Sequence, residues 1–375
     1  MTAADRLTGE PVHDFGGASK WVDIDGPVHY LDFGGPASAP LIVAVHGLGG
    51  AAVNWSAIAP LLTDSYRVLA PDLSGHGLTE AGTRGTDVQA NRTLLHRFIE
   101  SVSDDPVIVM GNSMGGMIAL LEAGTAPGKV AGLILVDPAL PFQPVRPDPL
   151  VTAVFALAAA PVLGPLISRQ RRLLPVESMI ASILALCCVD ASRIPPEIVA
   201  MHIEVAKQRA AMNGNGKDLS HAARSVIETA GYIRGKAYRR AIRQVTCPVL
   251  LVHGERDRLV PVVAARTAAK AHPDWAVVLL PDVGHVPQLE APADTAAAIT
   301  AWLAGPGAEA AKAATPPLNS LLVRRRLRES MTGWLSRGTL RSASGACRGE
   351  TRGYLATCSA AGWTLGRNEA ASGTG

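Results

Sequence analysis

The chain has 375 residues, 48% of them hydrophobic, which is enough for one large domain with an insertion or for two domains. The net charge is +3, but residues 306–375 carry ten Lys and Arg against four Glu, so residues 1–305 have a net charge of −3. A mildly acidic main part gives no support to nucleic-acid binding there. Five scattered Cys, an odd number, argue against a disulfide framework and match no zinc pattern, so we expect a reducing, cytoplasmic location.

Short apolar runs that alternate with helical patterns dominate the first part of the chain. After a flexible leader at 1–19, two strands flank the hairpin signal Asp25-Gly26. Buried strands are predicted at 41–45, 67–70, 106–110, 130–136, 249–252 and 276–280, and helices at 52–62, 87–102, 117–123, 261–271 and 293–303. This alternation predicts an α/β fold with a mostly parallel sheet that is covered by helices on both faces.

The alternation stops between residues 139 and 245, where we find no strand pairs and predict a helical insertion. The core would then comprise residues 20–138 and 246–305. Leu150 to Ile167 lacks charged residues, but Pro161, Gly164 and Pro165 interrupt it. We therefore expect an apolar element of the insertion there and no membrane span.

The last part of the chain, residues 306–375, is basic and of low complexity, and we expect it to be a disordered tail. Within it, Leu318 to Leu335 alternates apolar residues with an Arg cluster and could form a basic amphipathic helix on an anionic surface. Weak peripheral membrane contact through the tail or the insertion is therefore one possible partner interaction.

One pentapeptide, Gly111-Asn112-Ser113-Met114-Gly115, lies between a predicted strand and a predicted helix. A serine between two glycines at such a turn is the nucleophile elbow, G-x-S-x-G. The turn lifts the Ser113 hydroxyl above the sheet, at a helix N-terminus whose dipole favours negative charge. We predict Ser113 as a catalytic nucleophile, which requires a base, a group that orients the base, and oxyanion donors.

The predicted base is His285, because it follows the strand 276–280 at the sheet edge where ligands bind and because imidazole titrates near working pH. Asp257, just after the strand 249–252, is the predicted orienting carboxylate, with Asp137 as the competitor after the strand 130–136. Asp257 gives the order Ser, Asp, His along the chain. Structural roles are expected for His46, His76, His221, His253 and His272.

Two backbone N–H groups are the predicted oxyanion donors. Met114 directly follows the nucleophile, and Leu48 lies in the glycine-rich loop 46–50, which follows the strand 41–45. Glycine allows close approach of this backbone to a ligand. The loop has no phosphate-binding fingerprint, and we predict neither a cofactor nor a metal.

Together these motifs resemble the α/β-hydrolase superfamily. The resemblance covers about residues 20–305 and is carried by loop 46–50, the elbow and three further stretches, Asp72-Leu73-Ser74-Gly75-His76-Gly77, His253-Gly254-Glu255-Arg256-Asp257 and Gly284-His285-Val286-Pro287. It implies an eight-stranded, mostly parallel sheet with a helical lid after the sixth strand, here about 139–245. It also implies that Ser113, Asp257 and His285 form a catalytic triad.

Within that superfamily, the serine at the elbow argues against epoxide hydrolases and haloalkane dehalogenases, which use Asp there. The elbow is similar to that of the carbon–carbon bond hydrolases of meta-cleavage products, but those usually have Trp after the catalytic His, where this chain has Val286. We predict a carboxylic ester hydrolase that forms an acyl-enzyme with a small, apolar ester. The alternatives are a carbon–carbon bond hydrolase and a non-catalytic ligand-binding member.

Overall fold

The computed structural model describes residues 15–141, 148–160, 174–212, 217–231, 233–316, 357–359 and 362–364. The chain divides into two units, Met1–Leu321 and Leu322–Gly375. The described part of the second unit is an antiparallel pair of strands, β9 (Thr357–Ser359) and β10 (Gly362–Thr364). Everything that bears on the predicted site lies in the first unit.

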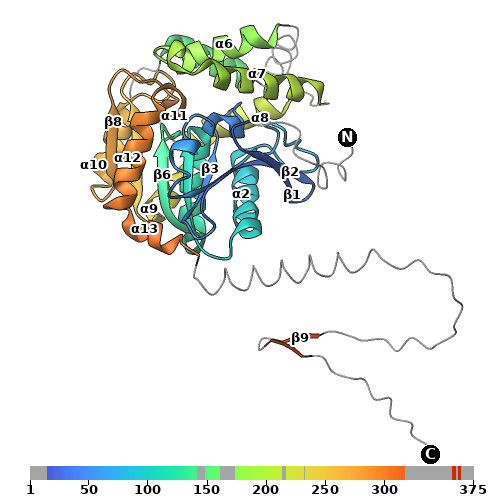
Figure 1. Ribbon diagram of the computed structural model, residues 1–375. Helices are drawn as coiled ribbons and strands as arrows, with labels where there is room; N and C mark the ends of the chain where they lie inside the picture. The colour runs from blue at the N-terminus through green and yellow to red at the C-terminus, as the bar shows by residue number, and fades with distance from the viewer. Residues whose placement is uncertain are drawn as a thin grey trace, which may run out of the picture. The chain divides into compact units, whose positions relative to one another are not determined.

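An eight-stranded sheet forms the centre of the first unit, in the order β1-β2-β4-β3-β5-β6-β7-β8 (Figure 1). β2 runs antiparallel to both of its neighbours, and the strands from β4 to β8 pair in parallel. The mostly parallel sheet is therefore confirmed. The strands are β1 (Ala18–Asp23), β2 (Pro27–Gly34), β3 (Leu41–Val45), β4 (Arg67–Pro71), β5 (Val107–Asn112), β6 (Val130–Val136), β7 (Val249–Gly254) and β8 (Ala276–Leu280).

Two apolar cores, one on each face of the sheet, explain why the central strands read as continuous hydrophobic runs. Every residue of β3, β5 and β7 is buried. One core contains residues of α2 (Val88–Val102), α3 (Met114–Thr125), α9 (Lys236–Gln244) and α10 (Val263–Ala271). The other contains residues of α12 (Pro292–Ala304) and α13 (Ala308–Ala313). The two groups of helices thus cover opposite faces of the sheet.

Residues 52–62 differ from the expected single helix. They form two 3₁₀ turns, η1 (Ala52–Trp55) and η2 (Ala59–Leu61). Pro60 cannot donate a backbone hydrogen bond, and Trp55 and Ile58 are fully buried. Tertiary packing of these large side chains therefore fixes the segment as tight turns, although their spacing is helical.

The described elements of the region between the sixth strand and β7 are all helices. Its helices are α4 (Pro149–Ala159), α6 (Val176–Cys187), α7 (Pro196–Ala211), α8 (Lys217–Ala230) and α9. α9 packs on α3, so the end of this region belongs to the layer that covers the sheet. α6 and α7 pack on each other, and Figure 1 shows both beyond the main body, on the side of α11 (Pro287–Glu290). The lid and its boundaries at 139 and 245 stay a prediction.

The expected boundary of the tail needs correction. Residues 308–313 form α13, which packs against β6 and buries Ala310, and Leu41 N donates to Ala314 O (3.2 Å). The alanines that looked like low complexity are the small residues that fit beside the sheet, since a Cβ at Gly132 would meet Ala310 Cβ at 2.5 Å. The predicted amphipathic helix at 318–335 lies outside the described residues. Of the helices that the structure describes, none has both the length and the apolarity to cross a membrane.

Candidate active site

Ser113 occupies a strained turn between β5 and α3. Its backbone has φ 55° and ψ −117°, in the region that side-chain-bearing residues rarely adopt. Ser113 N donates to Val136 O (3.1 Å), and Ala139 N donates to Ser113 O (2.9 Å), so the two strand ends hold the turn. A Cβ at Gly115 would lie 2.1 Å from Val45 O, which explains the glycine there. The predicted elbow geometry is present.

Loop 46–50 lies directly against Ser113. A Cβ at Gly47 would approach Ser113 Cβ to 3.0 Å, so the backbone that carries Leu48 runs beside the serine. Met114 is the first residue of α3, and its backbone N–H therefore has no partner within the helix. The two predicted oxyanion donors belong to backbone segments that flank the same side chain.

His285 and Asp257 form a buried pair across two strand ends. His285 Nδ1 donates to Asp257 Oδ2 (2.7 Å), and the other oxygen of Asp257 accepts Leu259 N (2.7 Å) and Val260 N (3.0 Å). Burial would raise the pKa of Asp257, but the charge and hydrogen bond of His285 and the nearby His253 outweigh burial and lower it. Asp257 is therefore an ionised carboxylate that fixes the orientation and tautomer of the imidazole.

The elbow and the histidine loop are joined through Asn112. Its side-chain amide donates to His285 O (3.0 Å) and to Val136 O (3.0 Å). Among the described residues no hydrogen bond links the Ser113 hydroxyl itself to His285. Catalytic hydrogen bonds are commonly long in unliganded enzymes and tighten around the substrate.

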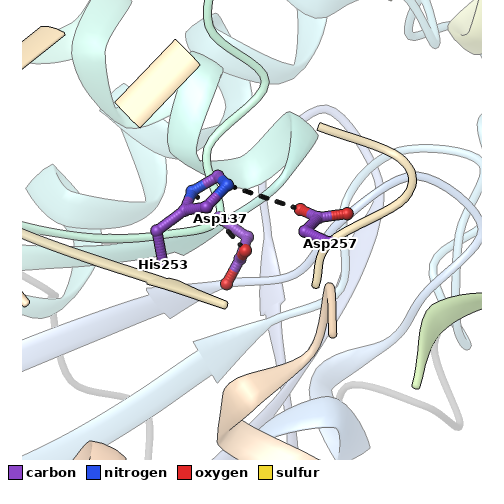
Figure 2. A group of neighbouring side chains, drawn as sticks. All are labelled: Asp137, His253 and Asp257. Atoms are coloured by element: carbon purple, nitrogen blue, oxygen red, sulfur yellow. Dashed lines mark ion pairs between the residues drawn. The ribbon is translucent and has the colours of Figure 1, made fainter. Parts of the chain in front are cut away.

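Asp137 and His253 lie beside Asp257, completely buried (Figure 2). His253 Nδ1 is 3.5 Å from Asp137 Oδ1, and His253 Nε2 is 3.8 Å from Asp257 Oδ2. Burial first, and then the charge of Asp257, raise the pKa of Asp137 well above its ordinary value. Burial also lowers the pKa of His253. The competing carboxyl is thus next to the chosen one, while His285 pairs with Asp257.

Asp137, His253 and Asp257 are spaced closely enough to be considered as a metal site, because one candidate ligand atom from each residue lies within 4.8 Å of the others. Most of the lone pairs of Asp257 are already used, however. Asp257 accepts from His285 and from two backbone N–H groups, and Asp137 Oδ1 accepts Gly254 N (3.0 Å). The donor set therefore does not favour a resident metal.

Glu290, on α11, fixes the histidine loop and was missed by the sequence analysis. Its buried carboxylate accepts Gly284 N (2.8 Å), Val189 N (2.9 Å) and Asp190 N (2.8 Å). His285 N also donates to Cys187 O (2.7 Å). Hydrogen bonds to backbone groups thus hold the segment after α6 and the loop of His285 together. No sequence motif predicts these hydrogen bonds.

The other histidines have the structural roles that were expected. His46 Nδ1 bonds Gly47 O (2.8 Å), while its Nε2 accepts Leu73 N (3.0 Å). His76 Nδ1 bonds Ser74 O (3.0 Å), and burial lowers its pKa to about 3. His272 stacks on Trp275, and His221 lies 3.2 Å from Thr86 Oγ1.

A cavity of about 410 Å³ adjoins the Asp257 side of the cluster. It is formed by the end of α6 and the following residues, Ala185 to Val189, together with Arg256, Asp257 and Arg258. Val286 and Leu289, next to His285 in the chain, pack in one apolar cluster with Ile180, Leu184 and Ile198 of α6 and α7. These two helices therefore border the edge of the sheet that carries the predicted site.

Comparison with known proteins gives a consistent set of relatives. A model of the alpha/beta hydrolase family matches residues 42–298. The pimeloyl-[acyl-carrier protein] methyl ester esterase of Aromatoleum aromaticum is 32% identical over 69% of this chain and 96% of its own. Lipase 1 of Psychrobacter immobilis is 26% identical over 71% and 77%. A thermophilic esterase from Thermogutta terrifontis superposes with a TM-score of 0.58 at 21% identity, over 77% and 99%. These relationships support a hydrolase.

Proposed function

Because this chain belongs to the alpha/beta hydrolase family, we propose that it is a serine hydrolase that cleaves carboxylic esters through an acyl-enzyme. The observation that carries the proposal is the strained serine of the elbow at the same sheet edge as the buried Asp257–His285 pair. Asn112, which donates to His285 O, supports the juxtaposition.

In the proposed reaction the Ser113 oxygen attacks the ester carbonyl while His285 Nε2 takes the hydroxyl proton. The oxyanion of the tetrahedral intermediate accepts hydrogen bonds from Leu48 N and Met114 N. The C–O bond then breaks, and His285 delivers the proton to the departing alcohol. Water, activated by the same imidazole, hydrolyses the acyl-enzyme and restores Ser113. Asp257 stabilises the imidazolium at both stages.

An ester with an apolar moiety fits the surroundings best. Leu150 and Leu157 of α4 and Ile183 of α6 are exposed on the helices after the sixth strand. If this region is the lid, these side chains are available to an apolar acyl or alcohol group. A methyl ester esterase and a lipase among the relatives favour the same substrate class.

The test is covalent labelling of purified protein with a fluorophosphonate probe, followed by peptide mapping. We expect a single adduct at Ser113 in the wild type, none in Ser113→Ala, and an unchanged adduct in the matched control Ser182→Ala, whose hydroxyl donates to Ser178 O within its own helix. A folded wild-type protein without an adduct at Ser113 would contradict the proposal.

Turnover defines the reaction class. We expect hydrolysis of simple esters of graded acyl length, lost in Ser113→Ala. The alternative, carbon–carbon bond hydrolysis, rests on the similarity of the elbow sequence and predicts turnover of vinylogous diketone ring-cleavage products instead. Exclusive turnover of those diketones would replace the ester assignment while leaving the nucleophile unchanged.

A further inference from the structure

We propose that Asp137 is a positioning residue for the triad: a neutral carboxylic acid whose proton is donated to the Asp257 carboxylate. The inference rests on the proposed role of Asp257 as the orienting acid. It is carried by the arrangement of hydrogen-bond acceptors around Asp137, His253 and Asp257, which Figure 2 shows.

The hydrogen bond of His253 fixes its tautomer. Its Nε2 lies 2.9 Å from Val260 O, and a carbonyl oxygen can only accept, so Nε2 carries the hydrogen. Burial lowers the pKa of His253 and keeps the ring neutral. Its Nδ1 is then a bare acceptor that faces Asp137 Oδ1 at 3.5 Å and has no donor among the described residues.

The carboxyl groups of Asp137 and Asp257 face each other with too few donors between them. Asp137 Oδ1 accepts Gly254 N, but Asp137 Oδ2 is buried and has no donor within the described part of the chain. One oxygen of Asp137 and one oxygen of Asp257 lie within 4.8 Å of each other. Two carboxylates can share a hydrogen bond only if one of them is protonated. A proton on Asp137 therefore removes the repulsion between two buried negative charges and leaves His253 Nδ1 facing a neutral group.

The proton belongs on Asp137 because the two groups are stabilised unequally. Asp257 receives His285 Nδ1–H and two backbone N–H groups, all of which favour its ionised form. Asp137 receives one backbone N–H, from Gly254. Burial and the neighbouring charge of Asp257 both disfavour a second negative charge there.

A neutral donor at this position has a consequence for catalysis. It holds the Asp257 carboxylate in the orientation that serves His285 without adding a second charge that would trap the imidazolium. The ionisable groups that face the pair come from four places: His253 on β7, His285 after β8, Glu290 on α11 and Cys187 at the end of α6.

The decisive comparison is between Asp137→Asn and Asp137→Ala. Asparagine keeps an acceptor for Gly254 N, offers an amide donor to Asp257, and tolerates the left-handed backbone of Asp137 (φ 44°). We expect Asp137→Asn to retain kcat within about threefold and the same acid limb of kcat/KM against pH. Asp137→Ala should lose about tenfold or more in kcat, because a hydrogen bond to a charged group is lost. Melting temperatures separate this loss from unfolding.

An ionised Asp137 predicts a different outcome. Neutralising it in Asp137→Asn would remove a negative charge near His285 and move the acid limb to lower pH by about one unit. If Asp137 rather than Asp257 orients the base, Asp137→Asn would abolish turnover. Either result overturns the proposal.

Infrared spectroscopy gives a readout that does not need activity. At neutral pH the wild type should show the carbonyl stretch of a protonated carboxyl group, absent in Asp137→Asn and retained in the exposed control Asp64→Asn. The absence of this band in the wild type overturns the proposal, as does stoichiometric binding of added Zn²⁺ that depends on Asp137. Failure of Ser113 labelling would remove the proposed enzyme and leave the band in place, so the two failures are distinguishable.

Discussion

Backbone strain marks individual residues around the candidate site. Among the described residues that have a side chain, Asp25, Ser113, Asp137 and Asp282 have positive φ. Ser113 and Asp137 directly follow β5 and β6, and Asp282 lies two residues after β8, at the edge where parallel strands present ligands. Each such residue costs of the order of 1–3 kcal/mol and persists only where its surroundings fix it. Strain concentrated at this edge is what a preorganised site would contain.

The contact between loop 46–50 and the elbow can be tested at Gly47. A methyl group there would press on Ser113 Cβ at 3.0 Å and on Asn112 Oδ1 at 3.3 Å. Gly47→Ala should therefore displace the oxyanion loop and lower kcat by about 10²-fold, as for the loss of one donor, with a small change in Tm. Gly128→Ala, where a Cβ has no neighbour within 4 Å, is the control. Equal kcat in the two variants would contradict the predicted position of the oxyanion site.

His76 predicts how stability depends on pH. Because the pKa of His76 in the folded chain is about 3, below its ordinary value of 6.5, the unfolded chain binds a proton between these pH values that the folded chain does not. Stability is fully present above pH 6.5 and falls below it, by up to about 1.4 kcal/mol per pH unit.

The measurement is Tm at pH 7.5 and at pH 5.5 for wild type and His76→Gln. The drop in Tm between the two pH values should be smaller in the variant by about 2 °C. His46 and His253, whose pKa values burial also lowers, remain in both proteins, so only the difference between the two drops is informative. An identical drop would show that His76 does not contribute.

At the scale of elements, α11 is short but connects three segments through one carboxylate. Glu290→Gln replaces one carboxylate oxygen with an amide N–H₂, which then faces either Gly284 N or the pair Val189 N and Asp190 N, all of which now donate. Loss of hydrogen bonds to a buried charge costs about 1.5–3 kcal/mol each, so Tm should fall. Because the His285 loop shifts with it, kcat should fall more than KM changes.

The matched control is Glu255→Gln, which breaks an exposed ion pair with Arg266 and should change neither Tm nor kcat measurably. If Glu290→Gln behaved like Glu255→Gln, the clamp between α11 and the residues after α6 would not support the histidine loop.

The elements also show what the sequence could reveal. The strands 41–45, 130–136 and 276–280 have their predicted bounds. The first two are continuous apolar runs, the signature of a strand buried on both faces, whereas β8 lies at the edge of the sheet and is mostly half-buried. The 3₁₀ turns of 52–62 were not predictable, since side chains from elsewhere in the chain decide them. Glu290 was missed because it binds backbone N–H groups, whose positions exist only in the fold. The pairing of His285 with Asp257 could be ranked, but not measured, from the order of motifs.

On the scale of the whole molecule, the folded unit extends beyond the boundary that composition suggested. α13 packs on β6, and Ala314 O accepts Leu41 N at the start of β3. Small, uniform alanine side chains have little sequence signal but fit where there is little room, since even a Cβ added at Gly132 would lie only 2.5 Å from Ala310 Cβ. The proposed membrane contact of the tail can then be assigned only to residues after 316.

Two truncations separate the folded end from the tail. A chain that ends at residue 316 should keep the Tm and kcat of the full chain, whereas one that ends at 305 should lose stability, because the apolar surface under Ala310 and Ala314 becomes exposed. Sedimentation with anionic liposomes should pellet the full chain more than the 1–316 chain, as electrostatic attraction of the Arg-rich tail requires. Equal pelleting would remove the membrane role of the tail, and equal Tm of the two truncations would restore the boundary at 305.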